Sequence, residues 1–141
     1  MKEEIIIKNQ EEMVKFAAKL AKVSNKGDII GLKGTLGAGK TFFASAFINA
    51  LSKKEVDVLS PTFNLVYNYN TDMGEVYHFD LYRVKSEDEL YNIGIEDALI
   101  NGISLIEWPE IAKNFFKDSK QYKEIEIKIG KSREERLALL T

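Results

Sequence analysis

A glycine-rich segment over residues 34–41, GTLGAGKT, constrains the fold of this chain more than any other feature. It matches the pattern G-x-x-x-x-G-K-[ST], in which glycines let the backbone turn its N–H groups inward around phosphate. An apolar segment, DIIGLK, precedes it, and a segment with apolar residues at helical spacing follows it. Such a strand–loop–helix unit presents a helix N-terminus to an anion. The segment therefore predicts a phosphate-binding loop rather than a flexible turn.

The rest of the chain predicts one α/β domain over residues 1–141, with helices on both faces of a sheet. Asn9 is expected to cap the first helix, with Glu12 completing a capping box and an apolar face running from Met13 to Val23. A second capping box at Ser86 and Pro109 in a first turn predict two further helices. Two segments around TDMG predict an antiparallel hairpin. The other strands are expected at residues 3–8, 28–33, 56–59, 102–107, 123–130 and 136–141.

Composition narrows the function classes. The chain has no cysteine, which excludes disulfides and cysteine-ligated zinc, and its single histidine cannot form a histidine-rich metal site alone. A net charge of −2 with only three arginines argues against tight, direct binding of nucleic acid. The sequence shows no apolar run long enough to span a membrane, and MKEEIIIK, acidic where a signal peptide is basic, is not expected to act as one. The expected compartment is the cytoplasm, with no membrane partner.

The choice of base follows from the position of NKGD, residues 25–28. The motif resembles the guanine reader N-K-x-D, but it stands at the start of the strand whose other end leads into the loop. It would lie far from a bound base, so we interpret it as a turn that ends the preceding helix. Without a guanine reader, ATP is the expected ligand.

Two acids are expected near the loop, because ligands of open α/β sheets gather at the carboxyl ends of strands. Glu107 closes the apolar segment ISLIE and is expected to hold Mg²⁺, either directly or through water. Asp80, at the end of VYHFD, either binds the metal or positions the attacking water. Thr62 in SPTF is either a switch-like hydroxyl near the γ-phosphate or a plain turn residue. Arg83 is either a phosphate neighbour or a surface residue.

Five segments in this order, GTLGAGKT, SPTF, YHFDLYR, EDEL…GIED and LIEWPE, resemble the TsaE family over essentially the whole chain. The resemblance implies an α/β, three-layer P-loop NTPase fold with a mixed, mainly parallel central sheet and an antiparallel hairpin. It implies Mg²⁺-dependent ATP hydrolysis in the synthesis of N6-threonylcarbamoyladenosine next to the tRNA anticodon. The implied partner is the heterodimer of the transferase TsaD with TsaB, and tRNA is an indirect partner through that complex.

The resemblance also implies roles for individual residues. Lys40, Thr62, Asp80 and Glu107 are the expected catalytic residues, and Thr41 and Glu107 the expected metal ligands. Trp108 follows the metal-site glutamate. The nucleotide is expected to contact two groups: the loop residues Gly34, Leu36, Gly37, Ala38, Gly39, Lys40 and Thr41, and, on the adenine side, Asn9, Gln10 and a C-terminal arginine, either Arg133 or Arg136.

Two other functions fit the loop. A small P-loop kinase would need an acceptor pocket and usually an arginine-bearing lid, and no arginine occurs between residues 84 and 132. A nucleotide-sensing adaptor would bind ATP without needing Asp80 or Glu107. For an ATPase so poor in arginine, we expect slow intrinsic turnover that accelerates when a partner docks.

Overall fold

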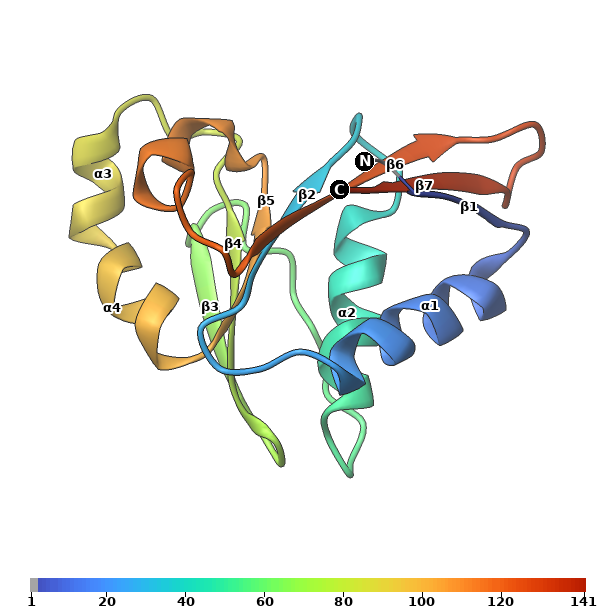
Figure 1. Cartoon of the computed structure of the whole chain (residues 1–141), viewed down its shortest axis with the longest axis horizontal. Coiled ribbons are helices and arrows are strands. Elements are labelled where there is room, and N and C mark those ends of the chain that lie inside the picture. The colour runs from blue at the N-terminus through green and yellow to red at the C-terminus, as the bar shows by residue number, and fades with distance from the viewer. Residues whose placement is uncertain (1–2) are drawn as a thin grey trace.

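The computed structural model describes residues 3–141 and shows a mixed sheet with helices on both faces (Figure 1). Within these residues seven strands form one sheet in the order β1-β7-β6-β2-β5-β4-β3. Its centre, β6-β2-β5-β4, is parallel, whereas β1–β7, β7–β6 and β4–β3 are antiparallel pairs. The predicted mixed sheet with a parallel centre and a hairpin is therefore confirmed. The strands are β1 (Glu3–Ile7), β2 (Ile29–Lys33), β3 (Val66–Thr71), β4 (Gly74–Asp80), β5 (Ile103–Glu107), β6 (Tyr122–Ile129) and β7 (Arg136–Leu140).

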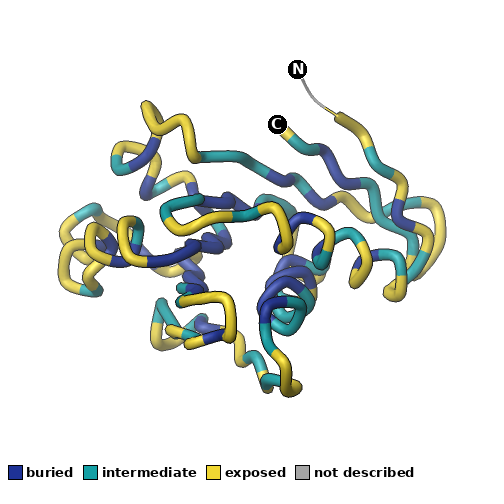
Figure 2. The backbone as a smooth tube through the Cα atoms, turned by 60° about the horizontal axis from the view of Figure 1, so that its bottom comes forward, coloured by how far each residue is buried: buried dark blue, intermediate teal, exposed yellow. Residues whose placement is uncertain are grey.

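Helices cover both faces of this sheet, giving three layers. Helices α1 (Gln10–Lys22) and α2 (Lys40–Ala50) pack on one face, and α3 (Glu87–Asn92), α4 (Ile95–Asn101) and the 3₁₀ helix η1 (Pro109–Phe115) on the other. Each face has its own apolar core, and buried residues concentrate in the central strands and in α2 (Figure 2). Since β2 and β5 are covered on both faces, they are buried at successive positions instead of at every second one.

The start of α1 follows the predicted capping chemistry with one difference. The Asn9 side chain accepts a hydrogen bond from the Glu12 N–H at 2.9 Å, as expected of an N-cap. The Glu12 carboxylate, however, accepts from the Lys8 N–H at 2.8 Å instead of that of Asn9. At the other end, Val23 is the C-cap and is 64% exposed, so the buried face of α1 ends before it.

The strand predicted for residues 56–59 is wrong, because this segment runs as a loop. Val56 and Val58 still pack against the core, which explains their apolar pattern. The Asn49 side chain of α2 takes the place of a neighbouring strand: it accepts from the Val56 N–H at 2.7 Å and donates to the Val56 carbonyl at 3.1 Å. A side-chain amide that satisfies both backbone groups removes the need for sheet pairing.

The sheet brings three strand ends together. Strand β2 leads into the loop over residues 34–39, β5 ends at Glu107 and β4 ends at Asp80. Because β2, β5 and β4 are adjacent and parallel, these ends meet at one edge, with Glu107 paired in register with both Leu32 and Asp80. The functional site is built at this edge.

Candidate functional site

The loop over residues 34–39 depends on glycine at its two ends. Gly34 has φ +149°, and a Cβ there would lie 2.6 Å from the Ile127 carbonyl oxygen of β6. Gly39 is the N-cap of α2 in a left-handed conformation, with φ +112°. Both conformations are strained for any residue that carries a side chain. The loop thereby turns sharply out of β2 and delivers the N-terminus of α2 to the sheet edge.

Lys40 lies folded back on this loop and is 5% exposed. Its ammonium donates to the Gly34 carbonyl and, at 3.2 Å, to the Thr35 carbonyl. It also stands 4.0 Å from the centre of the Trp108 ring, a cation–π distance. Burial lowers the pKa of Lys40 below its ordinary value, and the negative charges of Glu107, Asp80 and Glu110 partly oppose that shift. A buried ammonium held by neutral carbonyls is well suited to receive an anion.

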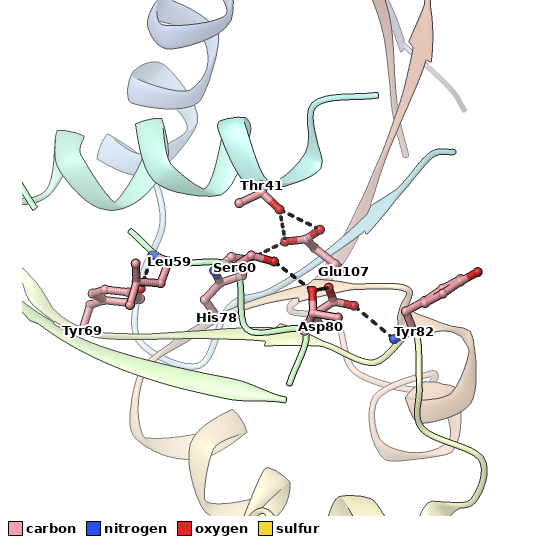
Figure 3. Close-up of polar contacts among 9 residues, drawn as sticks. Thr41, Leu59, Ser60, Tyr69, His78, Asp80, Tyr82 and Glu107 are labelled. Atoms are coloured by element: carbon pink, nitrogen blue, oxygen red, sulfur yellow. Dashed lines mark hydrogen bonds and ion pairs between the residues drawn. The ribbon is translucent and has the colours of Figure 1, made fainter. Parts of the chain in front are cut away.

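Thr41, the first-turn hydroxyl of α2, points at Glu107 (Figure 3). Its Oγ1 donates to Oε2 at 2.9 Å and lies 3.2 Å from Oε1. His78 of β4 approaches the same carboxylate, with Nε2 2.6 Å from Oε2. The Glu107 carboxylate is only 3% exposed, and these polar partners compensate for its burial.

Asp80 sits beside Glu107 and has its own set of hydrogen bonds. Its Oδ2 accepts from the Thr62 hydroxyl at 3.0 Å, and its Oδ1 accepts from the Tyr82 N–H at 3.1 Å (Figure 3). The Ser60 hydroxyl lies 2.9 Å from that of Thr62. The SPTF segment is thus joined to the sheet edge through Asp80, and Thr62 does more than close a turn.

Two cavities flank the loop. A cavity of about 270 Å³ lies over the N-terminus of α2 and includes Leu36, Lys40, Thr41, Thr62, Asp80 and Glu107 in its lining. A second, of about 780 Å³, lies on the other side and is lined by Asn9, Gln10, Ala38, Arg133 and Arg136 among others. Gly37, Gly39 and Phe42 line both cavities. Most residues expected at the phosphate tail therefore line the smaller cavity, and those expected at the adenine side line the larger one, whereas Gly34 lines neither and Ala38 lines only the larger.

Both candidate arginines reach the larger cavity, but only Arg136 bonds to the loop by its side chain. Its Nε donates to the Ala38 carbonyl at 2.8 Å, and its NH1 donates to the Arg133 carbonyl at 2.9 Å. Arg83 lies elsewhere, 4.6 Å over the exposed Phe63 ring. The NKGD turn stands at the amino end of β2, away from both cavities, in agreement with its interpretation as a turn.

The donor set fits Mg²⁺ in the way a phosphate loop requires. No group of three or more histidine or acidic side chains with metal-binding geometry occurs in residues 3–141. Mg²⁺ at such loops takes one or two protein oxygens and completes its shell with waters and substrate phosphates, so a larger cluster is unnecessary. Thr41 and Glu107 supply hard oxygen donors in direct contact with each other.

Sequence reasoning missed several members of the site. His78, Ser60, Phe42 and the backbone N–H of Tyr82 contact or line it, yet only Asp80 was singled out on β4. The signal for His78 was present, because it lies two residues before Asp80 and so shares its strand face.

None of the helices over residues 3–141 has the length and apolarity to cross a bilayer.

A three-layer α/β fold whose phosphate loop joins β2 to α2, with acids at the ends of β4 and β5, is the fold of the P-loop NTPases. The profile of one family, described as "Threonylcarbamoyl adenosine biosynthesis protein TsaE", matches residues 7–138. The chain belongs to the TsaE family.

Named relatives and a solved structure agree with this assignment. The chain is 46% identical over 110 residues to the tRNA threonylcarbamoyladenosine biosynthesis protein TsaE of Rickettsia felis, covering 78% of this chain and 64% of that protein. It is 43% identical over 108 residues to the protein of the same name from Aquifex aeolicus, covering 76% and 77% of the two chains. The crystal structure of Bacillus subtilis YdiB superposes with a TM-score of 0.77 at 28% identity, covering 99% of this chain and 84% of that one.

Proposed function

We propose that this protein is a Mg²⁺-dependent ATPase that serves the synthesis of threonylcarbamoyladenosine in tRNA. The observation that carries the proposal is the 2.9 Å contact between the Thr41 hydroxyl and Glu107, made at the N-terminus of a helix that follows a phosphate loop. That contact joins the two side chains whose oxygens P-loop enzymes use for magnesium. The pathway follows from the family and from the printed names of relatives.

Each residue has a distinct task in this proposal. The loop amides and Lys40 bind the phosphate tail, and Lys40 exchanges its bonds to the Gly34 and Thr35 carbonyls for phosphate oxygens. Thr41 and Glu107 hold Mg²⁺, which when bound neutralises charge on the β- and γ-phosphate oxygens. Asp80, held by Thr62 and the Tyr82 N–H, orients the attacking water. Adenosine occupies the cavity beside Asn9, Gln10 and Arg136.

Turnover is proposed to be slow until a partner docks. Phosphoryl transfer accelerates strongly when an arginine reaches the transferred group. Of the three arginines, Arg83 stacks on Phe63, and Arg133 and Arg136 line the cavity on the other side of the loop. We infer that the TsaD–TsaB heterodimer is the partner that completes the site, and that tRNA is reached only through it.

Phosphate release from the purified protein with Mg²⁺-ATP tests the activity. We expect slow release that stops when the metal is chelated, with no phosphate transferred to small metabolites. Efficient transfer to an acceptor would instead identify a kinase. Intact cellular function of Asp80→Asn and Glu107→Gln variants that still bind ATP would identify an adaptor.

Capture of partners from a bacterial lysate tests the pathway. We expect the tagged protein to retain the TsaD–TsaB pair, and ATP to change the amount retained. Failure to recover that pair both with and without ATP would contradict the proposed partners while leaving the ATPase intact.

A further inference from the structure

His78 has an environment that packing alone does not explain. Its ring is 0% exposed, on the face of β4 that points toward α2, and its Nε2 lies 2.6 Å from Oε2 of Glu107 (Figure 3). The other ring nitrogen, Nδ1, has no hydrogen-bond partner in the described part of the chain. The polar contact of this buried ring is therefore directed at one carboxylate oxygen.

The chemistry of the pair fixes the direction of the hydrogen bond. A carboxylate only accepts, so Nε2 carries the proton and donates it. Burying an imidazole whose Nδ1 is left unpaired is unfavourable, and an apolar side chain would fill the space without that penalty. A histidine at this position donates a hydrogen bond to Glu107, which a leucine could not do.

The two donors to Glu107 differ in what happens to them when metal binds. A threonine hydroxyl that ligates Mg²⁺ turns a lone pair toward the metal, so the Thr41 proton is no longer fixed on Glu107. The His78 bond needs no such change, because the ring comes from the neighbouring strand β4 and is not itself a metal ligand in this proposal. The register sets it in place: Glu107 pairs with Asp80, two residues beyond His78 on the same face of β4.

We propose that His78 is a positioning residue that anchors Oε2 of Glu107, so that Oε1 remains free to serve Mg²⁺. The inference deepens the proposed function and rests on it, since it concerns the same metal site. Partners behind a metal ligand typically change metal affinity or activity by about 10–100-fold when removed. His78 is expected to act on the Mg²⁺ requirement and to leave metal-free ATP binding unchanged.

Two amide substitutions separate this role from packing. In His78→Gln the side-chain NH₂ is three bonds from Cβ, as Nε2 is in histidine, so the donor stays near Oε2. In His78→Asn the NH₂ is one bond shorter and falls back toward the position of Nδ1. His78→Leu removes the donor and keeps an apolar volume. Ser104→Ala is the matched control, because Ser104 is equally buried on the adjacent strand β5 and its hydroxyl has no partner within residues 3–141.

The test measures ATP binding to the full chain with and without Mg²⁺, using the fluorescence of the single tryptophan, Trp108, which lies against Lys40. Mn²⁺ titration followed by electron paramagnetic resonance gives the metal affinity directly. We expect His78→Asn and His78→Leu to raise the Mg²⁺ and Mn²⁺ requirement about 10–100-fold, with His78→Gln and Ser104→Ala close to wild type. Metal-free ATP affinity should change less than about twofold in all variants that fold.

The outcomes separate the inference from the proposed function. If His78→Asn binds metal as tightly as His78→Gln and wild type, or if metal-free ATP binding falls as much as metal binding, His78 is not a positioning residue. If the wild-type protein itself binds no Mg²⁺-ATP, the proposed function is overturned first, and this inference with it.

Discussion

Asp80 and Glu107 are register partners on the adjacent parallel strands β4 and β5, so two carboxylates leave the sheet side by side at the same edge. Both are buried, with 7% and 3% exposure. Two neighbouring carboxylates repel each other when both are charged. The hydrogen bonds from Thr41, Thr62, His78 and the Tyr82 N–H offset that repulsion. A site arranged in this way favours the arrival of a divalent cation.

Substitution of either acid should separate function from stability. For Asp80→Asn we expect turnover to fall by roughly 10²–10⁴-fold, as for loss of a general base, with Mg²⁺-ATP affinity near wild type. For Glu107→Gln we expect the Mg²⁺ requirement to rise at least about 10-fold. Since each change relieves repulsion between the two carboxylates, the melting temperature without ligand should stay equal or rise. The exposed Glu110→Gln is the control and should change none of these quantities.

Gly34→Ala should destabilise the fold, because the added Cβ would lie 2.6 Å from the Ile127 carbonyl oxygen at a backbone φ of +149°. We expect a loss of roughly 2–4 kcal/mol in the free energy of unfolding, from strain and overpacking together. Gly94→Ala is the matched control: its φ is +75°, with no atom within 4 Å of the added Cβ, so only about 1–2 kcal/mol is expected. Urea unfolding measures both, and equal losses would show that the contact with β6 is unimportant.

Lys40 predicts a pH dependence of ATP binding. Burial lowers its pKa in the free protein, whereas bound phosphates stabilise the ammonium and raise that pKa. Between the two pKa values the complex holds a proton that the free protein lacks, so ATP binding takes up a proton and weakens as pH rises. The loss should begin below the ordinary lysine pKa of about 10.4.

Calorimetry in two buffers of different ionisation heat measures this proton uptake. Lys40→Arg should abolish it, because arginine stays charged over the whole range, while Lys33→Ala should leave it unchanged. Identical binding heats in the two buffers at every pH up to the ordinary lysine pKa of about 10.4 would contradict the assignment to Lys40.

Asn49 should govern the segment that carries Ser60 and Thr62. Its side chain accepts from the Val56 N–H and donates to the Val56 carbonyl, and Asn49→Ala removes both bonds. We expect a loss of about 1–3 kcal/mol in the free energy of unfolding. Asn49→Asp keeps the acceptor but sets a carboxylate oxygen against the Val56 and Ser45 carbonyls, so its loss should be at least as large. If urea unfolding gives both variants wild-type stability, the loop is held by Val56 and Val58 packing alone.

Local patterns determined most of the architecture, because they report on short-range chemistry. The phosphate loop, the Asn9 cap and the hairpin around TDMG each depend on residues a few positions apart. The missing strand at residues 56–59 shows the limit: Val56 and Val58 are apolar and partly buried in the expected alternation, but Asn49, on another element, satisfies the backbone of Val56. The apolar pattern of a segment does not show whether its backbone pairs with a neighbouring strand or with a side chain.

The site was less accessible to sequence reasoning, because its contacts join distant elements. The ends of VYHFD and ISLIE indicated Asp80 and Glu107, since parallel strands share an edge. His78 reaches Glu107 because it lies two residues before Asp80, the register partner of Glu107. Only the register of β4 against β5 defines that pairing. The contact of the Arg136 guanidinium with the loop likewise depends on the pairing of β6 with β7, which the sequence does not show.

The bond between Arg136 Nε and the Ala38 carbonyl predicts that this arginine holds the loop in shape as well as lining the larger cavity. Arg136→Ala removes that bond, and we expect ATP affinity to fall about 5–10-fold, the equivalent of roughly 1–1.4 kcal/mol. Arg136→Lys keeps the positive charge but loses the planar donor, so if shape is what matters its affinity should fall nearly as far.

Arg133→Ala is the control for cavity charge. Arg133 lines the same cavity, but its backbone carbonyl is what accepts the hydrogen bond from Arg136 NH1, and alanine retains that carbonyl. Its affinity should therefore change less than that of Arg136→Ala when nucleotide binding is titrated without metal. A larger effect at Arg133, or full rescue by Arg136→Lys, would mean that charge in the larger cavity outweighs the hydrogen bond to the loop.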